Sequence, residues 1–136
     1  MYKSKEEAYD RILENNAKWR ENNYDIFRLS NILLQAKNRA IKHGLPYDLD
    51  IEWFKHKALV VGKCEVTGIS FNHAKPFVKN KRNPFGASVD RINPEKGYTK
   101  DNCRVVCWIH NRAKGDDDLL DLYYYCKALV KAIEGE

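Results

Sequence analysis

Three polar side chains stand at the junctions of a predicted strand–turn–strand–helix unit over residues 87–115. Asp90 lies near the end of the first strand, Asn102 opens the second, and Asn111 lies on the short helix. A carboxylate and two amides that converge on one pocket are a common means of holding a divalent ion against a phosphate. We therefore expect the chemistry of this chain to lie within this unit.

The residues between these side chains define the elements that position them. Asn93-Pro94 ends the first β-prone run, because proline has no N–H to give to a ladder. A second β-prone run, residues 103–106, follows the turn residues 97–102. The pattern becomes helical from Cys107, and Gly115 is a residue type that is common just past a helix end.

The unit also carries a family resemblance through Asp90-Arg91-Ile92, Asn102, Asn111-Arg112 and Lys114. This order resembles the HNH, or ββα-metal, nuclease motif, in which Asp-His-Ile ends the first strand, Asn starts the second, and His or Asn lies on the helix. Asn111 and Lys114 follow Asn102 by nine and twelve residues. The HNH domains of CRISPR effector nucleases are similar in these two offsets, which there run from the central Asn to an Asn and a Lys. Short phage proteins labelled HNH-like are similar in their S-x-D-R-I-x-P, K-G-Y-T-x-D-N and N-x-x-K-G elements. The resemblance covers the last half of the chain well.

The resemblance implies a role for each matching residue. It makes Asp90 a ligand of Mg²⁺ or Mn²⁺ through a carboxylate oxygen, as hard cations prefer, with Asn111 as the second protein ligand. Asn102 would hold the loop and the catalytic residue in place by hydrogen bonds, or approach the metal itself. The metal would bridge the scissile phosphate and stabilise the leaving oxygen while a water attacks in line. The implied catalytic residues are Asp90, Arg91, Asn102 and Asn111.

Arg91 stands where the family has the histidine that activates water. A guanidinium keeps its proton at working pH, so Arg91 cannot be the general base, although its paired donors can clamp a phosphate. Three alternatives stay open: metal-bound water loses its proton without a base, His73 or His110 substitutes, or the protein no longer cleaves. On an ideal helix His110 points about 100° away from Asn111.

Many HNH proteins also carry a zinc knuckle of two Cys-x-x-Cys pairs. The corresponding positions here are Cys64-x-x-Thr67 and Cys107-x-x-His110, which leaves Cys64, Cys107 and His110 as ligands for Zn²⁺. Structural zinc normally has four sulfur or nitrogen ligands, and threonine is a poor fourth. We therefore favour a knuckle that has lost its metal and is held by packing.

Positive charge is concentrated on the same part of the chain. Residues 72–115 carry ten Lys or Arg against three acidic residues, a net charge of +7, whereas residues 116–136 carry −4. A basic centre of this kind is what contact with the phosphates of double-stranded DNA needs, although it also fits an ordinary solvated face. The expected DNA-binding residues are Lys79, Lys81, Arg82, Arg91, Lys96, Lys100, Arg104, Arg112 and Lys114.

The remaining sequence predicts an α+β, mainly helical single domain around this core. Residues 1–62 form helical support, residues 63–115 a hairpin, a loop and the ββα unit, and residues 116–136 a C-terminal helix. Helices are expected over residues 5–22, where the apolar stripe is thin, over residues 24–43, and after a cap at Asp48 or Asp50. In the last helix one face is expected to be core, and it consists of Leu119, Tyr123, Cys126, Leu129, Val130 and Ile133.

The apolar runs are far shorter than the roughly 20 residues that span a bilayer, so we expect a cytoplasmic protein without a membrane partner. Four cysteines suit reduced thiols or metal ligands better than a disulfide scaffold. The leading hypothesis is a phage-derived, HNH-like DNA endonuclease or nickase that needs Mg²⁺ or Mn²⁺. The alternatives are a DNA-binding or regulatory protein on a catalytically lapsed HNH scaffold, and a phage protein-binding module that docks through its first helix.

Overall fold

The computed structural model describes residues 4–76 and 81–135. Its elements are α1 (Lys5–Asn22), α2 (Tyr24–His43), α3 (Ile51–Lys55), the π-helix η1 (His56–Val61), β1 (Ala87–Arg91), β2 (Cys103–Cys107), α4 (Trp108–Lys114) and α5 (Leu119–Glu134). This mixture of helices with a two-stranded sheet confirms the predicted α+β class. No helix among the described residues is long and apolar enough to cross a membrane.

Local capping signals set the ends of the first helices. The hydroxyl of Ser4 accepts a hydrogen bond from the N–H of Glu7 at the start of α1. A carboxylate oxygen of Asp50 accepts one from the N–H of Trp53 at the start of α3. Gly44 ends α2 in the left-handed conformation, with φ 65°. Because these signals are local in sequence, the predicted bounds of α1 and α2 are confirmed.

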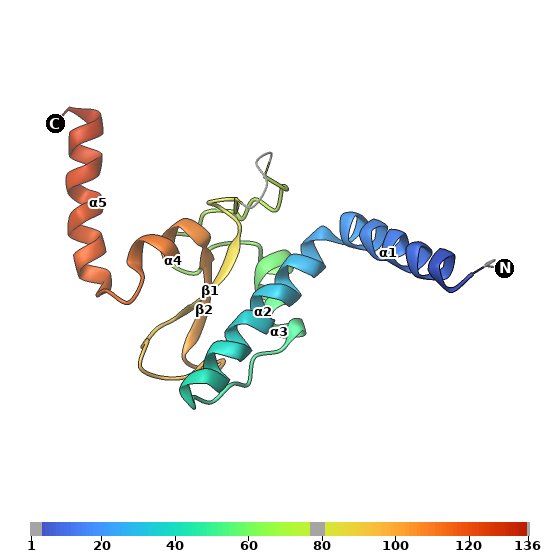
Figure 1. Cartoon of the computed structure of the whole chain (residues 1–136). Coiled ribbons are helices and arrows are strands. Elements are labelled where there is room, and N and C mark those ends of the chain that lie inside the picture. The colour runs from blue at the N-terminus through green and yellow to red at the C-terminus, as the bar shows by residue number, and fades with distance from the viewer. Residues whose placement is uncertain (1–3, 77–80, 136) are drawn as a thin grey trace.

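The core lies between α2, the α3–η1 segment and the β1–β2 pair, and α2 crosses the middle of the molecule (Figure 1). α2 contributes Leu29, Leu33, Ala36 and Ala40 at helical spacing. The predicted third helix is present, but its second half is a π-helix that ends at Gly62. Both halves reach the core, because Phe54 and Ala58 are fully buried.

β1 and β2 form an antiparallel ladder in which Asp90 stands opposite Arg104 and Ala87 opposite Cys107. β2 runs directly into α4, so the unit is strand, loop, strand and helix, as predicted. The unit differs from the prediction at its edges, since β2 includes Cys107 and α4 begins at Trp108. This ββα unit brings Asp90 of β1 next to the side chains of α4.

The loop between β1 and β2 packs against the segment that precedes α3. The N–H of Tyr98 donates to the carbonyl of Pro46 at 3.0 Å, and the N–H of Asp48 donates to the carbonyl of Tyr98 at 3.1 Å. A Cβ atom at Gly97 would lie 2.2 Å from the oxygen of Pro46, so glycine is required for this approach. The loop is therefore fixed by the helical part of the chain.

The outer helices differ from the core in their exposure. α5 projects from the body beside α4, and α1 extends from the opposite side (Figure 1). The prediction that one face of α5 is core is wrong, because none of its residues is buried. The pattern identified an amphipathic helix, but nothing within the described chain covers its apolar face. The thin apolar stripe of α1 is likewise exposed at Tyr9, Ile12, Leu13 and Trp19.

Candidate active site

Asp90 is a buried carboxylate that is surrounded by basic side chains. Only 3% of the residue is exposed. Its Oδ2 accepts a hydrogen bond from Nε of Arg104 at 3.0 Å, and its Oδ1 accepts one from Nζ of Lys114, on α4, at 3.3 Å. Buried charges are tolerated when they are paired in this way. Both oxygens of the predicted metal ligand are therefore satisfied within the fold.

His110 is the third basic side chain beside Asp90. Its Nε2 lies 3.9 Å from Oδ2 of Asp90 and is buried without a hydrogen-bond partner among the described residues. Burial lowers the pKa of His110; Asp90 works against this shift, and the charges of Arg104 and Lys114 add to it. The imidazole is consequently neutral at neutral pH, so its contact with Asp90 is not an ion pair.

A cavity of about 120 Å³ is lined in part by Asp90. Its lining includes Asp90, Arg91, Tyr98, Asn111 and Asp116. The structure thus brings the two predicted metal ligands, Asp90 and Asn111, onto one cavity, together with a second carboxylate from the start of the α4–α5 connection. His110 is not part of this lining.

Hydrogen bonds fix the orientation of the Asn111 side chain. Its Nδ2 donates to the carbonyl of Val89 at 2.8 Å and to the hydroxyl of Ser88 at 3.0 Å, both on β1. With both N–H groups used, Oδ1 is the atom of this amide that can accept a hydrogen bond or bind a cation. β1 therefore presents Asp90 and at the same time aligns Asn111.

These residues fit a hard divalent cation such as Mg²⁺ or Mn²⁺, because carboxylate and amide oxygens are its preferred ligands. A cation that binds Asp90 competes with the charges of Arg104 and Lys114, each of which uses one of the two lone pairs of a carboxylate oxygen. Among the described residues no group of three or more His, Cys, Asp or Glu side chains gathers to hold a metal. Mg²⁺ at this cavity would therefore keep several of its water ligands, as is usual for this ion.

Asn102 acts on the loop between the strands. Its Nδ2 donates to the carbonyls of Gly97 at 2.8 Å and Asn93 at 3.1 Å, and its Oδ1 accepts from the N–H of Asn93 at 3.1 Å. The side chain is buried and all three bonds stay within the loop. Of the two roles expected for Asn102, this geometry matches the one that holds the loop in place.

Arg91 lies at the edge of the cavity and is held there by the same loop. Its guanidinium carbon lies 4.7 Å from the ring centroid of Tyr98, and its Nη1 donates to the carbonyl of Lys96 at 3.3 Å. Arg39 of α2 also lines the cavity and its Nη1 is 3.5 Å from the Tyr98 hydroxyl. Two arginines thus line this cavity, and their paired N–H donors suit an anion.

His73, the other histidine considered as a base, points elsewhere. Its Nε2 lies 3.0 Å from the carbonyl oxygen of Ala58, in η1. Its ring also packs near Phe71, with 6.1 Å between the ring centroids. His73 therefore supports the loop after the hairpin, and the structure does not place it on the cavity beside Asp90.

The expected zinc ligands are only partly brought together. Cys64 and Cys107 are buried side by side, with the N–H of Cys107 donating to Sγ of Cys64 at 3.5 Å. Burial raises the pKa of the Cys107 thiol to about 11, with a further contribution from Cys64. His110 lies beside Asp90, and the three residues do not form a metal-binding group within the described chain. Val106 and Phe71 complete a small apolar cluster around the two thiols.

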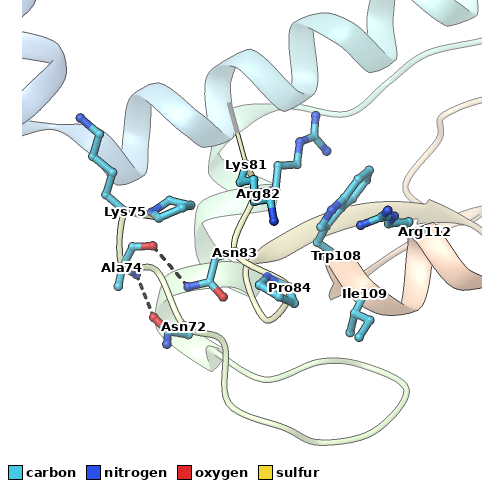
Figure 2. Close-up of a pocket in the computed structure, with 11 residues that line it drawn as sticks. Asn72, Ala74, Lys75, Lys81, Arg82, Asn83, Pro84, Trp108, Ile109 and Arg112 are labelled. Atoms are coloured by element: carbon cyan, nitrogen blue, oxygen red, sulfur yellow. Dashed lines mark hydrogen bonds between the residues drawn. The ribbon is translucent and has the colours of Figure 1, made fainter. Parts of the chain in front are cut away.

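A larger basic groove of about 840 Å³ lies next to this unit. Figure 2 shows Lys81 and Arg82 on one wall and Trp108, Ile109 and Arg112 of α4 on another. The guanidinium of Arg82 stacks on the indole of Trp108 at 4.2 Å from the ring centroid. Three of the predicted DNA-binding residues therefore share one groove, and Lys75 adds a fourth cation to it.

The other predicted DNA-binding cations have different surroundings. Arg104 and the buried Lys114 are paired with Asp90, and Lys100 is paired with Asp50 at 2.6 Å. Lys96 is exposed, and its carbonyl accepts a hydrogen bond from Arg91, which lines the Asp90 cavity. Lys79 lies outside the described residues. The predicted set thus divides into cations of the groove, cations of the cavity edge and cations that neutralise buried or exposed acids.

The fold can now be compared with known structures. The solved structure of the rare-cutting HNH restriction endonuclease PacI is similar to this chain, with a TM-score of 0.52 and 23% sequence identity over 79% of this chain and 80% of that one. The chain has an HNH-like fold. No protein-family model matches the sequence, and no curated protein matches it. At this identity the likeness concerns the fold.

Within the HNH-like fold, sequence reasoning missed three residues at the two openings. Asp116 was interpreted as part of a helix cap, but the capping bond of α5 comes from Asp118. Arg39 stands late in a predicted helix, where a cation suits either the helix dipole or contact with DNA, and the packing of α2 on the loop is not visible in the sequence. Trp108 had a usable signal, since an aromatic residue within a basic segment is typical of nucleic-acid contacts.

Proposed function

We propose that this chain is an HNH-type, metal-dependent DNA endonuclease or nickase that hydrolyses phosphodiester bonds. The observation that carries the proposal is the shared cavity of Asp90 and Asn111 inside an HNH-like ββα unit. The basic groove beside it offers cations for a DNA backbone. The proposal also specifies Mg²⁺ or Mn²⁺ as the metal and double-stranded DNA as the substrate. It further includes a phage origin and action in the cytoplasm of a bacterial host.

In this proposal the side chains of the cavity divide the work of binding and orientation. Arg91 and Arg39 receive the phosphate by paired N–H donors at the opening. Asp90 and Asn111 would hold Mg²⁺ or Mn²⁺, and the bound ion would supply polarisation of the phosphate and a lower pKa for water. Asn102 keeps the loop that carries Arg91 and Tyr98 in position.

We assign the proton acceptor to Asp116. Its carboxylate is exposed and lines the same cavity as Asp90 and Asn111, so it can accept a proton from a water there. His110 is less suited, because its Nε2 is buried and the residue does not line this cavity. In this proposal neither His73 nor Arg91 acts as the base.

The test is the cleavage of supercoiled plasmid by the purified protein with Mg²⁺ or Mn²⁺, followed on a gel. We expect nicking or cutting that EDTA stops and that Asp90→Asn reduces by at least about 10²-fold. The matched control is Asp101→Asn, an exposed aspartate of the same unit that bonds to Thr99. Absence of cleavage with both metals, or equal loss in both variants, would refute the proposal.

Asp116 is tested in the same assay by Asp116→Asn, with Asp117→Asn as the control. Both aspartates are exposed and adjacent, but only Asp116 lines the described cavity. We expect Asp116→Asn to lower the rate by about 10²-fold or more, the usual contribution of a general base, and to flatten the rise of the rate with pH. A rate and pH profile like those of Asp117→Asn would remove Asp116 from the mechanism.

A second candidate function, a DNA-binding protein on a catalytically lapsed HNH scaffold, is favoured by one specific observation. Both oxygens of Asp90 are already paired with Arg104 and Lys114, and Arg91 replaces the family's base. This candidate predicts salt-sensitive DNA affinity that does not change with EDTA or with Asp90→Asn. DNA affinity measured by fluorescence anisotropy with and without Mg²⁺ separates it from the enzyme.

A further inference from the structure

The basic groove carries apolar side chains that contact with a phosphate backbone does not require. Besides its cations, it is lined by Trp108 and by the exposed residues Pro84 and Ile109 (Figure 2). The backbone of a paired duplex is bound by cations and hydrogen-bond donors, and the faces of its bases are covered by their neighbours in the stack. The apolar part of the groove therefore fits a ligand that presents a flat, uncovered face.

Arg82 and Trp108 supply two planar groups within this groove. The guanidinium carbon of Arg82 lies 4.2 Å from the centroid of the indole, and Nη2 of Arg82 donates to Oε1 of Gln35 on α2 at 3.3 Å. Both residues are half-buried, so part of each faces the groove. Unpaired nucleobases stack on aromatic rings and on the planes of arginine side chains. The Arg82–Trp108 pair therefore has the chemistry of a base-stacking surface.

Backbone hydrogen bonds fix this surface before a ligand binds. The N–H of Trp108 donates to the carbonyl of Gly86 at 2.8 Å, and the N–H of Ile109 donates to the carbonyl of Pro84 at 2.8 Å. These two bonds join the start of α4 to the loop that carries Arg82 into β1. A surface that is already ordered loses less conformational entropy when it binds.

The Arg82–Trp108 pair also adjoins the Asp90 cavity. A small cavity of about 30 Å³ is lined by both members of the pair and by Tyr98 and Asn111. Tyr98 and Asn111 line the Asp90 cavity as well. A nucleotide held on the pair would therefore be a neighbour of the cavity in which the proposed chemistry takes place.

We propose that the groove binds an unpaired nucleotide of DNA, with its base stacked on the Arg82–Trp108 pair and its phosphate against Lys81 or Arg112. The substrate class is duplex DNA with an unpaired nucleotide next to the bond to be cut. This assignment rests on the proposed function, because it names the DNA that the same site would cleave. Binding of DNA in the absence of metal tests it separately from cleavage.

The first test compares two labelled duplexes by fluorescence anisotropy, in EDTA and at the same salt concentration. One duplex is fully paired, and the other has a single unpaired thymidine in one strand. We expect the full-length protein to bind the second duplex at least about 10-fold more tightly, an effect within the range of base–aromatic stacking. Equal affinities overturn the assignment even if the protein cleaves plasmid. A preference in a protein that never cleaves supports the assignment and refutes only the nuclease.

Two substitutions of Trp108 form a matched pair in this assay. Leucine and phenylalanine are both apolar and smaller than tryptophan, but only phenylalanine keeps a flat ring. We expect Trp108→Leu to reduce the preference for the unpaired nucleotide to less than about 2-fold and Trp108→Phe to keep at least about 5-fold of it. Trp19→Leu is the outside control, because Trp19 is 51% exposed on α1 and does not line the groove, so the full preference should remain.

Circular dichroism checks that the variants keep their helix content. Equal preferences in Trp108→Leu and Trp108→Phe overturn the assignment, because the flat ring would then have no part in binding. The same conclusion follows if Trp19→Leu loses the preference.

A second measurement locates the base in the wild-type protein and needs no variant. An iodinated deoxyuridine replaces the unpaired thymidine, and ultraviolet light joins it to an aromatic side chain that it contacts. We expect mass spectrometry of the joined peptide to identify Trp108. Joining to Trp19 or to Trp53, or no joined product from a duplex that is fully bound, overturns the assignment.

Discussion

At the scale of single residues, the state of Asp90 decides what the candidate site can do. Arg104 and Lys114 hold its two oxygens at 3.0 and 3.3 Å, and both are cations that a phosphate also attracts. A DNA phosphate that draws Lys114 away would release Oδ1 towards the cavity at the moment when substrate arrives. The pairing of Asp90 is thus compatible with both the nuclease and the DNA-binding protein. The two functions differ in whether DNA binding releases an oxygen of Asp90 for a metal.

Replacing Arg91 by histidine restores the Asp-His-Ile order of the HNH motif. Arg91 lines the cavity beside Asp90, so an imidazole at this position is within reach of a water there. In the Asp116→Asn background, which lacks the proposed proton acceptor, we expect Arg91→His to restore the single-turnover cleavage rate by about 10²-fold, the usual contribution of a general base. Arg91→Gln is the control, because it removes the guanidinium without supplying a base. A rate no higher than that of Arg91→Gln would show that the base is not what limits this site.

His110 makes the stability of the protein depend on pH. Its pKa is lowered in the folded state, chiefly by burial, so below about pH 6.5 the unfolded chain binds a proton that the folded chain resists. The free energy of unfolding should therefore be highest above pH 6.5 and fall as the pH drops from there towards the lowered pKa.

The measurement is urea unfolding at several pH values between 5 and 8, for the wild type and His110→Gln. Glutamine has no titrating group, so the variant should lose less stability than the wild type over the acid side of this range. Asp90, Arg104 and Lys114 face His110 in both proteins and cancel in the comparison. Parallel pH profiles would contradict a buried, neutral His110.

At the scale of elements, local signals were enough to predict most of the helices and both strands. The caps of α1 and α3 and the glycine that ends α2 act within a few residues, which is why the bounds of α1 and α2 and the start of α3 were predictable. The partners of Asp90 were not predictable from local signals, because Arg104 and Lys114 lie 14 and 24 residues away along the chain. Their contacts with Asp90 depend on the strand register and on the angle of α4. The burial of α5 was mispredicted for the same reason: amphipathicity identifies a face and leaves its partner open.

The loop between β1 and β2 depends on one buried amide. Asn102→Ala removes three hydrogen bonds and leaves the carbonyl of Gly97 buried without its partner. We expect a loss of about 2–3 kcal/mol in the free energy of unfolding, measured by chemical denaturation. Asp101→Ala is the control, since its carboxylate is exposed and bonds locally to Thr99; it should cost clearly less than Asn102→Ala. Equal losses would show that Asn102 does not fix the loop.

At the scale of the whole molecule, α1 and α5 project from opposite sides of the body that contains β1, β2 and α4 (Figure 1). The Asp90 cavity is small and lined by charged groups, whereas the basic groove is several times larger and combines cations with Trp108. A single DNA backbone that follows the cations of the groove would pass α4, which also carries Asn111. The arrangement therefore links binding in the groove to the proposed chemistry in the cavity.

The groove makes a quantitative prediction for DNA affinity. Each groove cation that contacts a phosphate releases a counterion, so Lys81→Ala and Arg112→Ala should each lower the slope of log affinity against log salt by about 1. Lys100→Ala is the matched control, because Lys100 is held by Asp50 away from the groove, and it should leave the slope unchanged. The slope is measured by fluorescence anisotropy of labelled duplex DNA between 50 and 300 mM salt, a range chosen to resolve about one charge. If all three variants shift the slope equally, the protein binds DNA through its general positive charge and the groove has no special part in it.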